Sequence, residues 1–419
     1  MSGPTGKAII ASLLATLILP TLGYAEGVLG GPGGLATTTP GFLIEEVLLT
    51  TPEGAPLALR YPTSLAFRGG DLLIVEGGRY AFAAPFEPHL AEGRILAVSL
   101  DGASGTARPL AEALADPVGI AVDGAGRIFF THYGRISILG EDGTLTDYTV
   151  GLPPNTADLV YAPVDDGGAV GDLVLSTGQG DLIDVNTTGA YSLAFAPDGT
   201  LFSTQAANGR PPDDPGFGGR DYGTDYSSSI LRPAPGIVDP SMVYARGCRN
   251  CYDLAVTPEG ALYASENVGF YRARLQAGSH RTALEGSSLL DANHLDSIVL
   301  VTEGQVRRVA TILPDSVTLG AAPTGLALAP PGFPSLTSSR LAVAIYSGIP
   351  ESSPEDGADD RGYVAFVEPE PVTGAGTVVP FLTGLDFPTD LTFGPDGALY
   401  VVEYFSGRLF RVTPLGGGA

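Results

Sequence analysis

One hairpin-forming phrase recurs seven times along the chain, and it constrains the fold more than any other feature. Each copy contains a short apolar strand, a turn with glycine, a second apolar strand and a polar break. The copies begin at Tyr61, Asp116, Asn155, Ala190, Cys251, Ala322 and Phe387. Their spacing is roughly thirty to seventy residues, and repeats at such periods are typical of arrays. The chain is therefore predicted to be built from one repeated unit.

Each unit is predicted to be an antiparallel β-sheet. DG, EG, GG or AG joins the strands, as in tight hairpins. A third strand follows several copies, for example from Gly93, Gly134 and Gly407, and the spacing leaves room for a fourth. A solenoid is the alternative, but solenoids rarely accommodate such unequal inserts. Radial sheets remove most exposed edges by repetition, so we expect an all-β fold: a β-propeller of six or seven four-stranded blades, closed by a strand within Gly41 to Leu49.

The amino-terminal segment has the pattern of an export signal. Lys7 precedes an apolar run, and Gly23-Tyr24-Ala25 suits signal peptidase. The apolar run is short for a membrane span, which needs about 20 residues. We expect a signal peptide at 1–25, a flexible leader rich in Gly and Thr at 26–40, and a single propeller domain at 41–419. The mature chain would then be periplasmic or extracellular, without a membrane span.

Charge excludes several functions. The formal net charge is −24 and the sequence pI is about 4.3, which argues against nucleic acid as a partner. Lys7 is the single lysine, so the mature chain has no lysine for Schiff-base chemistry, general base catalysis or phosphate binding. Arginine must supply its cationic contacts.

Two cysteines frame a short turn before a predicted inner strand. In an exported protein, Cys248 and Cys251 are expected to form a local disulfide. A thioredoxin-like role would need a strand-to-helix context, and a zinc site would need further ligands, which the neighbouring sequence lacks. Arg249 and Asn250 lie between the cysteines. Turns that precede inner strands open onto one end of a propeller channel, where ligands commonly bind.

From Ala190 onward the chain resembles the soluble glucose/sorbosone dehydrogenases, exported propellers that use pyrroloquinoline quinone (PQQ). The matching stretches are SLAFAPDGTLFST, SSSILRPAPG, ARGCRNCYDLAVTPEGALYASE, APTGLALAPPGFP and DFPTDLTFGPDGALYVVEYFSGRLFRVTP. The resemblance implies that Arg249 and Asn250 bind the cofactor. A guanidinium suits this role because it can stack on a planar tricarboxylate and pair with it.

The chain departs from this family at three places. Thr187 stands where the family has a catalytic histidine, and a threonine hydroxyl cannot accept a proton at neutral pH as imidazole does. The cofactor-binding lysine has no counterpart. The family's calcium loop is echoed only by Asp291, Asn293 and Asp296.

Equivalent positions in the copies predict two rings of side chains. The ends of the second strands give Glu76, His132, Thr177, Gln205, Glu266, Tyr346 and Glu403. His132 is the candidate base of this ring, although such residues can equally bind backbone amides of the adjoining loop. The first strands give Ser64, Gly119, Asp158, Ser192, Asp253, Gly325 and Asp390. Converging carboxylates need a cation or shared protons, so the candidate calcium ligands are Asp158, Asp253, Glu266 and Asp390.

These features lead to one expected function and two alternatives. The first is oxidation of a small-molecule sugar or alcohol by hydride transfer to PQQ, with calcium as a second cofactor. The second is a calcium-dependent hydrolase related to lactonases, and the third is a secreted interaction propeller without catalysis. Loss of the family histidine and lysine is what the third alternative would produce.

Overall fold

A computed structural model describes residues 34–77, 92–152, 156–162, 174–176, 182–206, 229–248, 251–267, 296–312, 323–346 and 362–415; for 156–162, 174–176, 182–190 and 206 it describes the backbone only. Within these ranges the regular structure consists of strands and short 3-10 turns such as Pro240–Met242. The same part of the chain contains no helix with the length and hydropathy of a membrane span.

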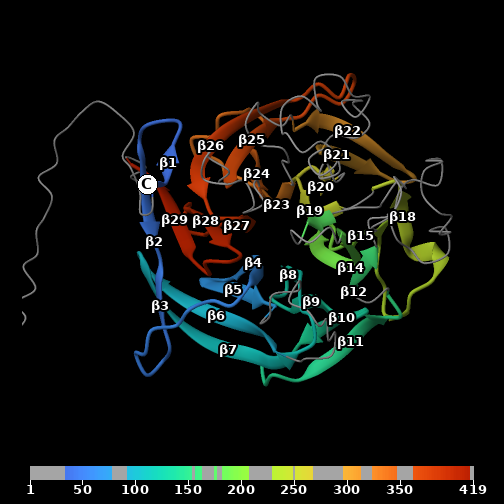
Figure 1. The fold of residues 1–419 in the computed structure, drawn as a ribbon, viewed down its shortest axis with the longest axis horizontal. Helices are drawn as coiled ribbons and strands as arrows, with labels where there is room; N and C mark the ends of the chain where they lie inside the picture. The colour runs from blue at the N-terminus through green and yellow to red at the C-terminus, as the bar shows by residue number, and fades with distance from the viewer. Residues whose placement is uncertain are drawn as a thin grey trace, which may run out of the picture.

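Six sheets stand radially around a central axis and form a six-bladed β-propeller (Figure 1). In each blade the first strand of the hairpin is innermost, and neighbouring inner strands contact one another around the ring. The strands of the first three blades are β4 (Pro62–Arg68), β5 (Asp71–Glu76), β6 (Gly93–Asp101) and β7 (Ser104–Leu114); β8 (Ile120–Val122), β9 (Ile128–His132), β10 (Arg135–Leu139) and β11 (Leu145–Val150); and β14 (Leu182–Phe195), β15 (Leu201–Ala206), β16 (Ser229–Leu231) and β18 (Val243–Arg246).

The other three blades repeat this order. Their strands are β19 (Cys251–Val256), β20 (Leu262–Glu266), β21 (Ser297–Thr302) and β22 (Gln305–Thr311); β23 (Pro323–Leu328), β24 (Leu341–Ile345), β25 (Gly362–Glu368) and β26 (Thr377–Leu385); and β27 (Pro388–Phe393), β28 (Leu399–Glu403), β29 (Leu409–Pro414) and β2 (Phe42–Glu46). Three short strands add to outer edges: β1 (Ala36–Thr37), β3 (Leu48–Thr50) and β17 (Gly236–Ile237).

The ring is closed by the predicted amino-terminal strand. β2 pairs antiparallel with β29, with Phe42 opposite Pro414 and Glu46 opposite Phe410. The sixth blade is thus built from both ends of the propeller domain, and the expectation for Gly41 to Leu49 is confirmed. Pairing with β2 covers the outer edge of β29 and closes the ring.

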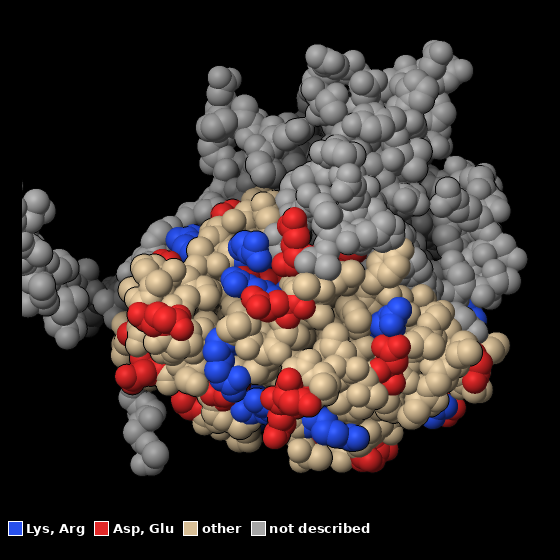
Figure 2. Space-filling view, turned by 90° about the horizontal axis from the view of Figure 1, so that it is seen from below, with Lys and Arg blue, Asp and Glu red and all other residues tan. Residues whose placement is uncertain are grey.

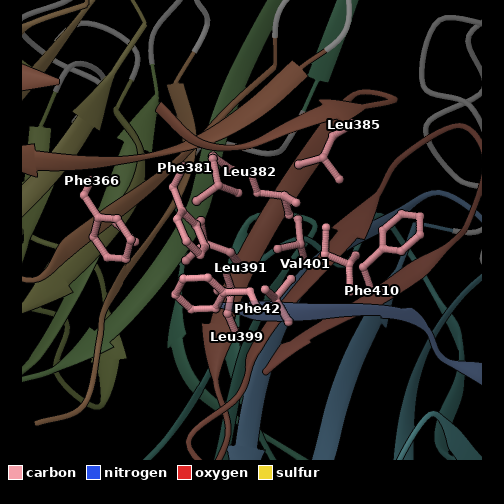
Figure 3. Packing of buried hydrophobic residues seen from close by; sticks show 14 of the residues in the cluster. Phe42, Phe366, Phe381, Leu382, Leu385, Leu391, Leu399, Val401 and Phe410 are labelled. Carbon is pink, nitrogen blue, oxygen red and sulfur yellow. The ribbon is translucent and has the colours of Figure 1, made fainter. Parts of the chain in front are cut away.

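The core lies between neighbouring blades. Both faces of most sheets are covered, so strands such as β24 are buried along their whole length. Between the fifth and sixth blades, Phe366 and Phe381 pack with Leu391, Phe410 and Phe42 (Figure 3). The rings of Phe42 and Phe381 meet edge to face at 4.8 Å. Burying one such side chain contributes about 1.5–3 kcal/mol.

The copy at Asn155 does not form a blade. Its strands, β12 (Thr156–Ala162) and β13 (Val174–Ser176), both pair with the first half of β14. The second half of β14 pairs with β15 and serves as the inner strand of the third blade. The resulting hairpin extends an existing strand, which fixes the number of blades at six. Asp158 therefore lies opposite Asn186 and does not share the position of Asp253 and Asp390 in the inner ring.

Charged residues are mixed on the surface. On the face shown in Figure 2, described Asp and Glu side chains are interspersed with Arg and form no large patch of one sign.

Candidate functional site

The inner strands carry a shared irregularity close to the channel. Register shifts occur at the same place in five blades, between Pro62 and Ser64, Ala190 and Leu193, Cys251 and Leu254, Pro323 and Leu326, and Pro388 and Asp390. A β-bulge turns a side chain away from its regular direction. The predicted ring positions Ser64, Ser192, Asp253, Gly325 and Asp390 lie at these bulges.

Asp253 joins three blades. Its carboxylate accepts the hydroxyl of Ser192 in the third blade and the amide of Leu326, at 2.6 Å, in the fifth blade. Its own amide donates to the hydroxyl of Ser265 at 3.0 Å. Asp253 is partly exposed and lies on β19, the innermost strand of its blade.

Asp390 makes the corresponding contacts two blades further on, in the sixth blade. Its carboxylate accepts the amide of Leu65, in the first blade, at 2.6 Å and the amide of Leu391 at 2.7 Å. Ser64 adds a side-chain hydrogen bond. Asp390 is 5% exposed, so it is more buried than Asp253.

Gly325 separates the two carboxyl groups. A Cβ atom at this position would lie 2.3 Å from Asp390 Oδ1 and 2.6 Å from Asp390 Cα, while the next amide, of Leu326, binds Asp253. The two acids therefore contact the same short segment of the fifth blade. Only a residue without a side chain leaves room for this arrangement.

Both acids have a carboxyl pKa above the ordinary value. Burial raises the pKa of Asp253 to about 6, against the hydrogen bonds from Ser192, Leu326 and Leu254. Burial, and next the charge of Asp253, raise the pKa of Asp390 well above its ordinary value. Close carboxylates cannot both ionise easily, so the pair favours one negative charge over two near neutral pH.

Aromatic side chains gather at one end of the propeller axis. In the first and sixth blades the inner strand begins beside the end of the second strand, because Pro62 pairs with Glu76 and Pro388 with Glu403. The residues next to these ends form what we name the aromatic row: Tyr61, Tyr404, Phe405, Phe387 and Tyr346. Successive ring centroids lie 5.3, 5.1, 4.9 and 4.8 Å apart. We call this end the channel mouth.

Two tyrosines connect the mouth with the acidic pair. The rings of Tyr191 and Tyr252 lie 5.5 Å apart. Burial raises the pKa of Tyr252 well above its ordinary value, and Tyr404, Tyr191, Asp390 and Asp253 add to this effect. Tyr252 thus lies close to both carboxylates and to the aromatic row.

The predicted acids at the ends of the second strands bind loop amides in two blades. Glu76 accepts the amide of Arg60 and the side chain of Arg94. Glu403 accepts the amide of Asp386 at 2.6 Å and Arg408 Nε at 2.9 Å. Both glutamates are fully buried. These hydrogen bonds hold in place the turn that precedes the inner strand.

Glu266 and His132 are turned toward outer strands. Glu266 accepts the hydroxyl of Ser297, on β21, at 2.8 Å. His132 Nε2 lies 2.8 Å from the hydroxyl of Ser137, on β10, and its ring stacks on Phe130 at 4.7 Å. Burial, and then Arg135, lower the pKa of His132 to about 4, so the ring is neutral at pH 7. The structure does not bring His132 to the acidic pair, and its role as a base stays a prediction.

The predicted metal ligands are only partly brought together. Asp253 and Asp390 are close to each other, Glu266 bonds toward an outer strand, and Asp158 lies on β12. Among the residues described, no group of three or more His, Cys, Asp or Glu is placed to hold a metal ion. Asp253 and Asp390 alone offer too few ligands, because calcium takes six to eight oxygens.

The segment between the cysteines lies outside the described residues, and with it Arg249 and Asn250. The flanking Cys248 and Cys251 are buried, and their Cα atoms are 5.6 Å apart with the sulfur atoms in contact. This separation is in the range that a disulfide spans. The aromatic row and the bonds of Asp253 were not predicted, because neighbours in the ring are distant in the sequence.

No protein-family model matches the chain, and no curated protein matches it in sequence. Among solved structures, the PQQ domain of pyranose dehydrogenase from Coprinopsis cinerea is similar at 15% identity, with 92% of this chain and 98% of that chain covered and a TM-score of 0.53. A Trichoderma reesei carbohydrate-active enzyme of family AA12, in a calcium structure, has 15% identity, 92% and 100% coverage and a TM-score of 0.53.

A streptogramin B lyase also matches, at 13% identity, with 89% of this chain and 98% of that chain covered and a TM-score of 0.42. This TM-score is too low to carry an argument. The two former similarities show a shared propeller fold, and the fold alone does not specify an activity.

Proposed function

We propose that the channel mouth binds a small molecule and that the chain oxidises a sugar or alcohol with PQQ as its cofactor. The observation that carries this proposal is the aromatic row above the Asp253–Asp390 pair. Aromatic faces bind planar rings and the apolar faces of sugars, and carboxylates accept hydrogen bonds from hydroxyl groups. A small polar substrate fits such a site better than a macromolecule does.

Among the described residues, the aromatic row suits the planar ring system of PQQ. The carboxylates of PQQ need a cationic side chain in addition. Arg94 and Arg408, near the ends of the second strands, are already paired with Glu76 and Glu403. The carboxylates of PQQ would therefore be held by Arg249, with Asn250 as an amide partner, as the sequence resemblance implies. When bound, PQQ would accept the hydride from the substrate carbon. The protein would orient the substrate and remove its hydroxyl proton.

Calcium does not fit the described residues, because two carboxylates lack the further oxygen ligands. The calcium-dependent hydrolase is therefore the weaker alternative. Export, with cleavage after Ala25, and a Cys248–Cys251 disulfide remain part of the proposal. The mass of the secreted protein, measured with and without a thiol-alkylating reagent under non-reducing conditions, tests both.

Reconstitution tests the proposed function directly. The mature protein is incubated with PQQ, and reduction of an electron-accepting dye is followed with a panel of aldoses and alcohols. We expect PQQ-dependent dye reduction with at least one substrate. Replacing Arg249 with Ala should weaken PQQ binding while leaving the melting temperature nearly unchanged. Absence of turnover, together with an unchanged melting temperature in PQQ, would reject the dehydrogenase.

A further inference from the structure

The two acids of the inner ring differ in access to the channel. Asp253 is partly exposed, whereas Asp390 is buried and accepts two backbone amides. Asp253 accepts one amide from another blade and the hydroxyl of Ser192. A molecule at the channel mouth would therefore reach Asp253 more easily than Asp390.

Both acids belong to one electrostatic unit. Asp253 interacts electrostatically with Asp390 on β27 and with Tyr252 on its own strand, and Ser192 on β14 donates a hydrogen bond to it. Tyr252 in turn interacts with Tyr191 and Tyr404. Asp390 holds its proton more firmly because it is more buried and because Asp253 is close. Pairs of carboxyl groups pushed to different pKa values commonly divide acid and base roles. Such a pair titrates as a unit.

We propose that Asp253 is the group that accepts the hydroxyl proton of the substrate at the channel mouth. This inference rests on the proposed function and assigns to Asp253 the step for which the sequence suggested His132. Three features carry it: the position of Asp253 on the innermost strand of its blade, its partial exposure, and its fixed orientation by Ser192 and Leu326.

The O–H bond of the substrate breaks and its proton passes to the carboxylate of Asp253. As the C=O bond forms, the adjacent C–H bond breaks, and a bound quinone would take up the hydrogen with its electron pair as hydride. The proton on Asp253 then returns to solvent through the channel. An acid whose pKa lies near the working pH is suited to this transfer, and burial provides that for Asp253.

The main test compares Asp253→Asn with Asp142→Asn, which makes the same change at an exposed turn between β10 and β11. Asparagine keeps the shape of the side chain and cannot accept the proton. With PQQ bound, we expect Asp253→Asn to lower kcat/KM at least 100-fold, the lower end of general base effects. PQQ affinity, measured by tyrosine fluorescence, should be unchanged in both variants.

A cofactor-free measurement accompanies the activity assay. The infrared carbonyl band of a protonated carboxyl group should disappear near pH 6 in the wild-type protein and in Asp142→Asn. That transition should be missing in Asp253→Asn. Its presence in Asp253→Asn would assign the transition to another group and would overturn the proposal.

Ser192→Ala provides a second variant in case Asp253→Asn does not fold. Ser192 acts as a positioning residue, and its hydroxyl lowers the pKa of Asp253. Its removal should move the acid limb of the pH–rate profile upward by roughly one pH unit, the equivalent of one charge-assisted hydrogen bond. An acid limb at the same pH in Ser192→Ala and in the wild-type protein would contradict the role of Asp253.

The outcomes separate this inference from the proposed function. If the wild-type protein binds no PQQ, both the function and the role of Asp253 are overturned. If it binds PQQ without turnover, the oxidation and the role of Asp253 are both overturned, and only the binding site remains. If the wild-type protein turns over and Asp253→Asn keeps its rate and pH profile, the role of Asp253 alone is overturned.

Discussion

The hydroxyl of Thr389, in the last blade, donates a hydrogen bond of 2.9 Å to the carbonyl oxygen of Pro62, in the first blade. Equivalent bonds run from Thr324 to Pro388 and from Thr63 to Val118, also at 2.9 Å. The threonine after the proline at the start of an inner strand thus connects its blade to the next one. Among the described residues, this bond is present at three of the six boundaries between blades.

Thr389→Val should weaken the closure of the ring. The substitution preserves shape and removes the donor to Pro62, which leaves a buried carbonyl with one bond fewer. We expect a loss of about 1–2 kcal/mol in the free energy of unfolding, measured with urea. Thr146→Val, at an exposed position of β11, is the control and should change little. Equal stability of the two variants would refute the contribution of this bond.

Gly325→Ala should disturb the acidic pair. The added methyl group would collide with Asp390 Oδ1 and with the amide of Leu391, 2.8 Å away. Overpacking of this kind costs about 1–3 kcal/mol. Gly124→Ala is the matched control, because a Cβ there meets nothing within 4 Å. The melting temperatures of both variants are compared by thermal unfolding. Equal stability of Gly325→Ala and Gly124→Ala would show that a methyl group fits between Gly325 and Asp390.

His132 should make folding more favourable as the pH rises. Its folded pKa of about 4 lies below the ordinary value of 6.5, so the unfolded chain binds more protons between these values. Linkage then makes the contribution of His132 increase from pH 4 to 6.5. It should reach about 2 kcal/mol, a value reduced for the partial exposure of the ring. The stability difference between wild type and His132→Gln, measured by urea unfolding across this range, should grow accordingly.

Asp253 should have the opposite effect over nearly the same range. Its folded pKa of about 6 lies above the ordinary 3.8, so the folded chain binds more protons and stability falls as the pH rises from 4 to 6. The wild-type protein should lose stability relative to Asp253→Asn in that interval. A constant difference would show that folding does not raise the pKa of Asp253.

The sequence was sufficient to predict the blades but not their number. Gly-containing turns and apolar strands specify each hairpin locally, and the closing strand follows from the need to pair β29. The copy at Asn155 has the same local pattern. In the structure this copy pairs with the first half of β14, and β14 then continues past Asn186 into the third blade. The sequence does not reveal this pairing, because it depends on contacts between strands.

The site was predicted in part. The alignment of repeats identified Asp253 and Asp390 as equivalent residues near the axis, because equivalent positions meet in a closed ring. It could not show that Gly325 leaves space between them or that Ser192 binds Asp253, since these partners come from different blades. Alignment also grouped His132 with Glu76 and Glu403, although its ring turns to Ser137. The position of a residue in its strand determines where its backbone lies. It does not determine which partner the side chain contacts.

Phe405→Ala should weaken binding at the channel mouth. Phe405 lies between Tyr404 and Phe387 in the aromatic row and is 38% exposed. Loss of one stacking contact of about 1 kcal/mol should raise the Kd for PQQ roughly fivefold. Leu415→Ala removes an exposed apolar side chain just beyond β29 and should leave the Kd unchanged. Equal Kd values would exclude the aromatic row from the binding site.

Titration of the mature protein with PQQ is the most direct test of the central claim. The chain has 17 tyrosines and no tryptophan, so its intrinsic fluorescence reports on tyrosines. Five of them lie at or near the channel mouth: Tyr61, Tyr191, Tyr252, Tyr346 and Tyr404. The account predicts saturable quenching with one PQQ per chain, weakened by Phe405→Ala and by Arg249→Ala. Linear, unsaturable quenching that is identical in wild type and both variants would contradict it.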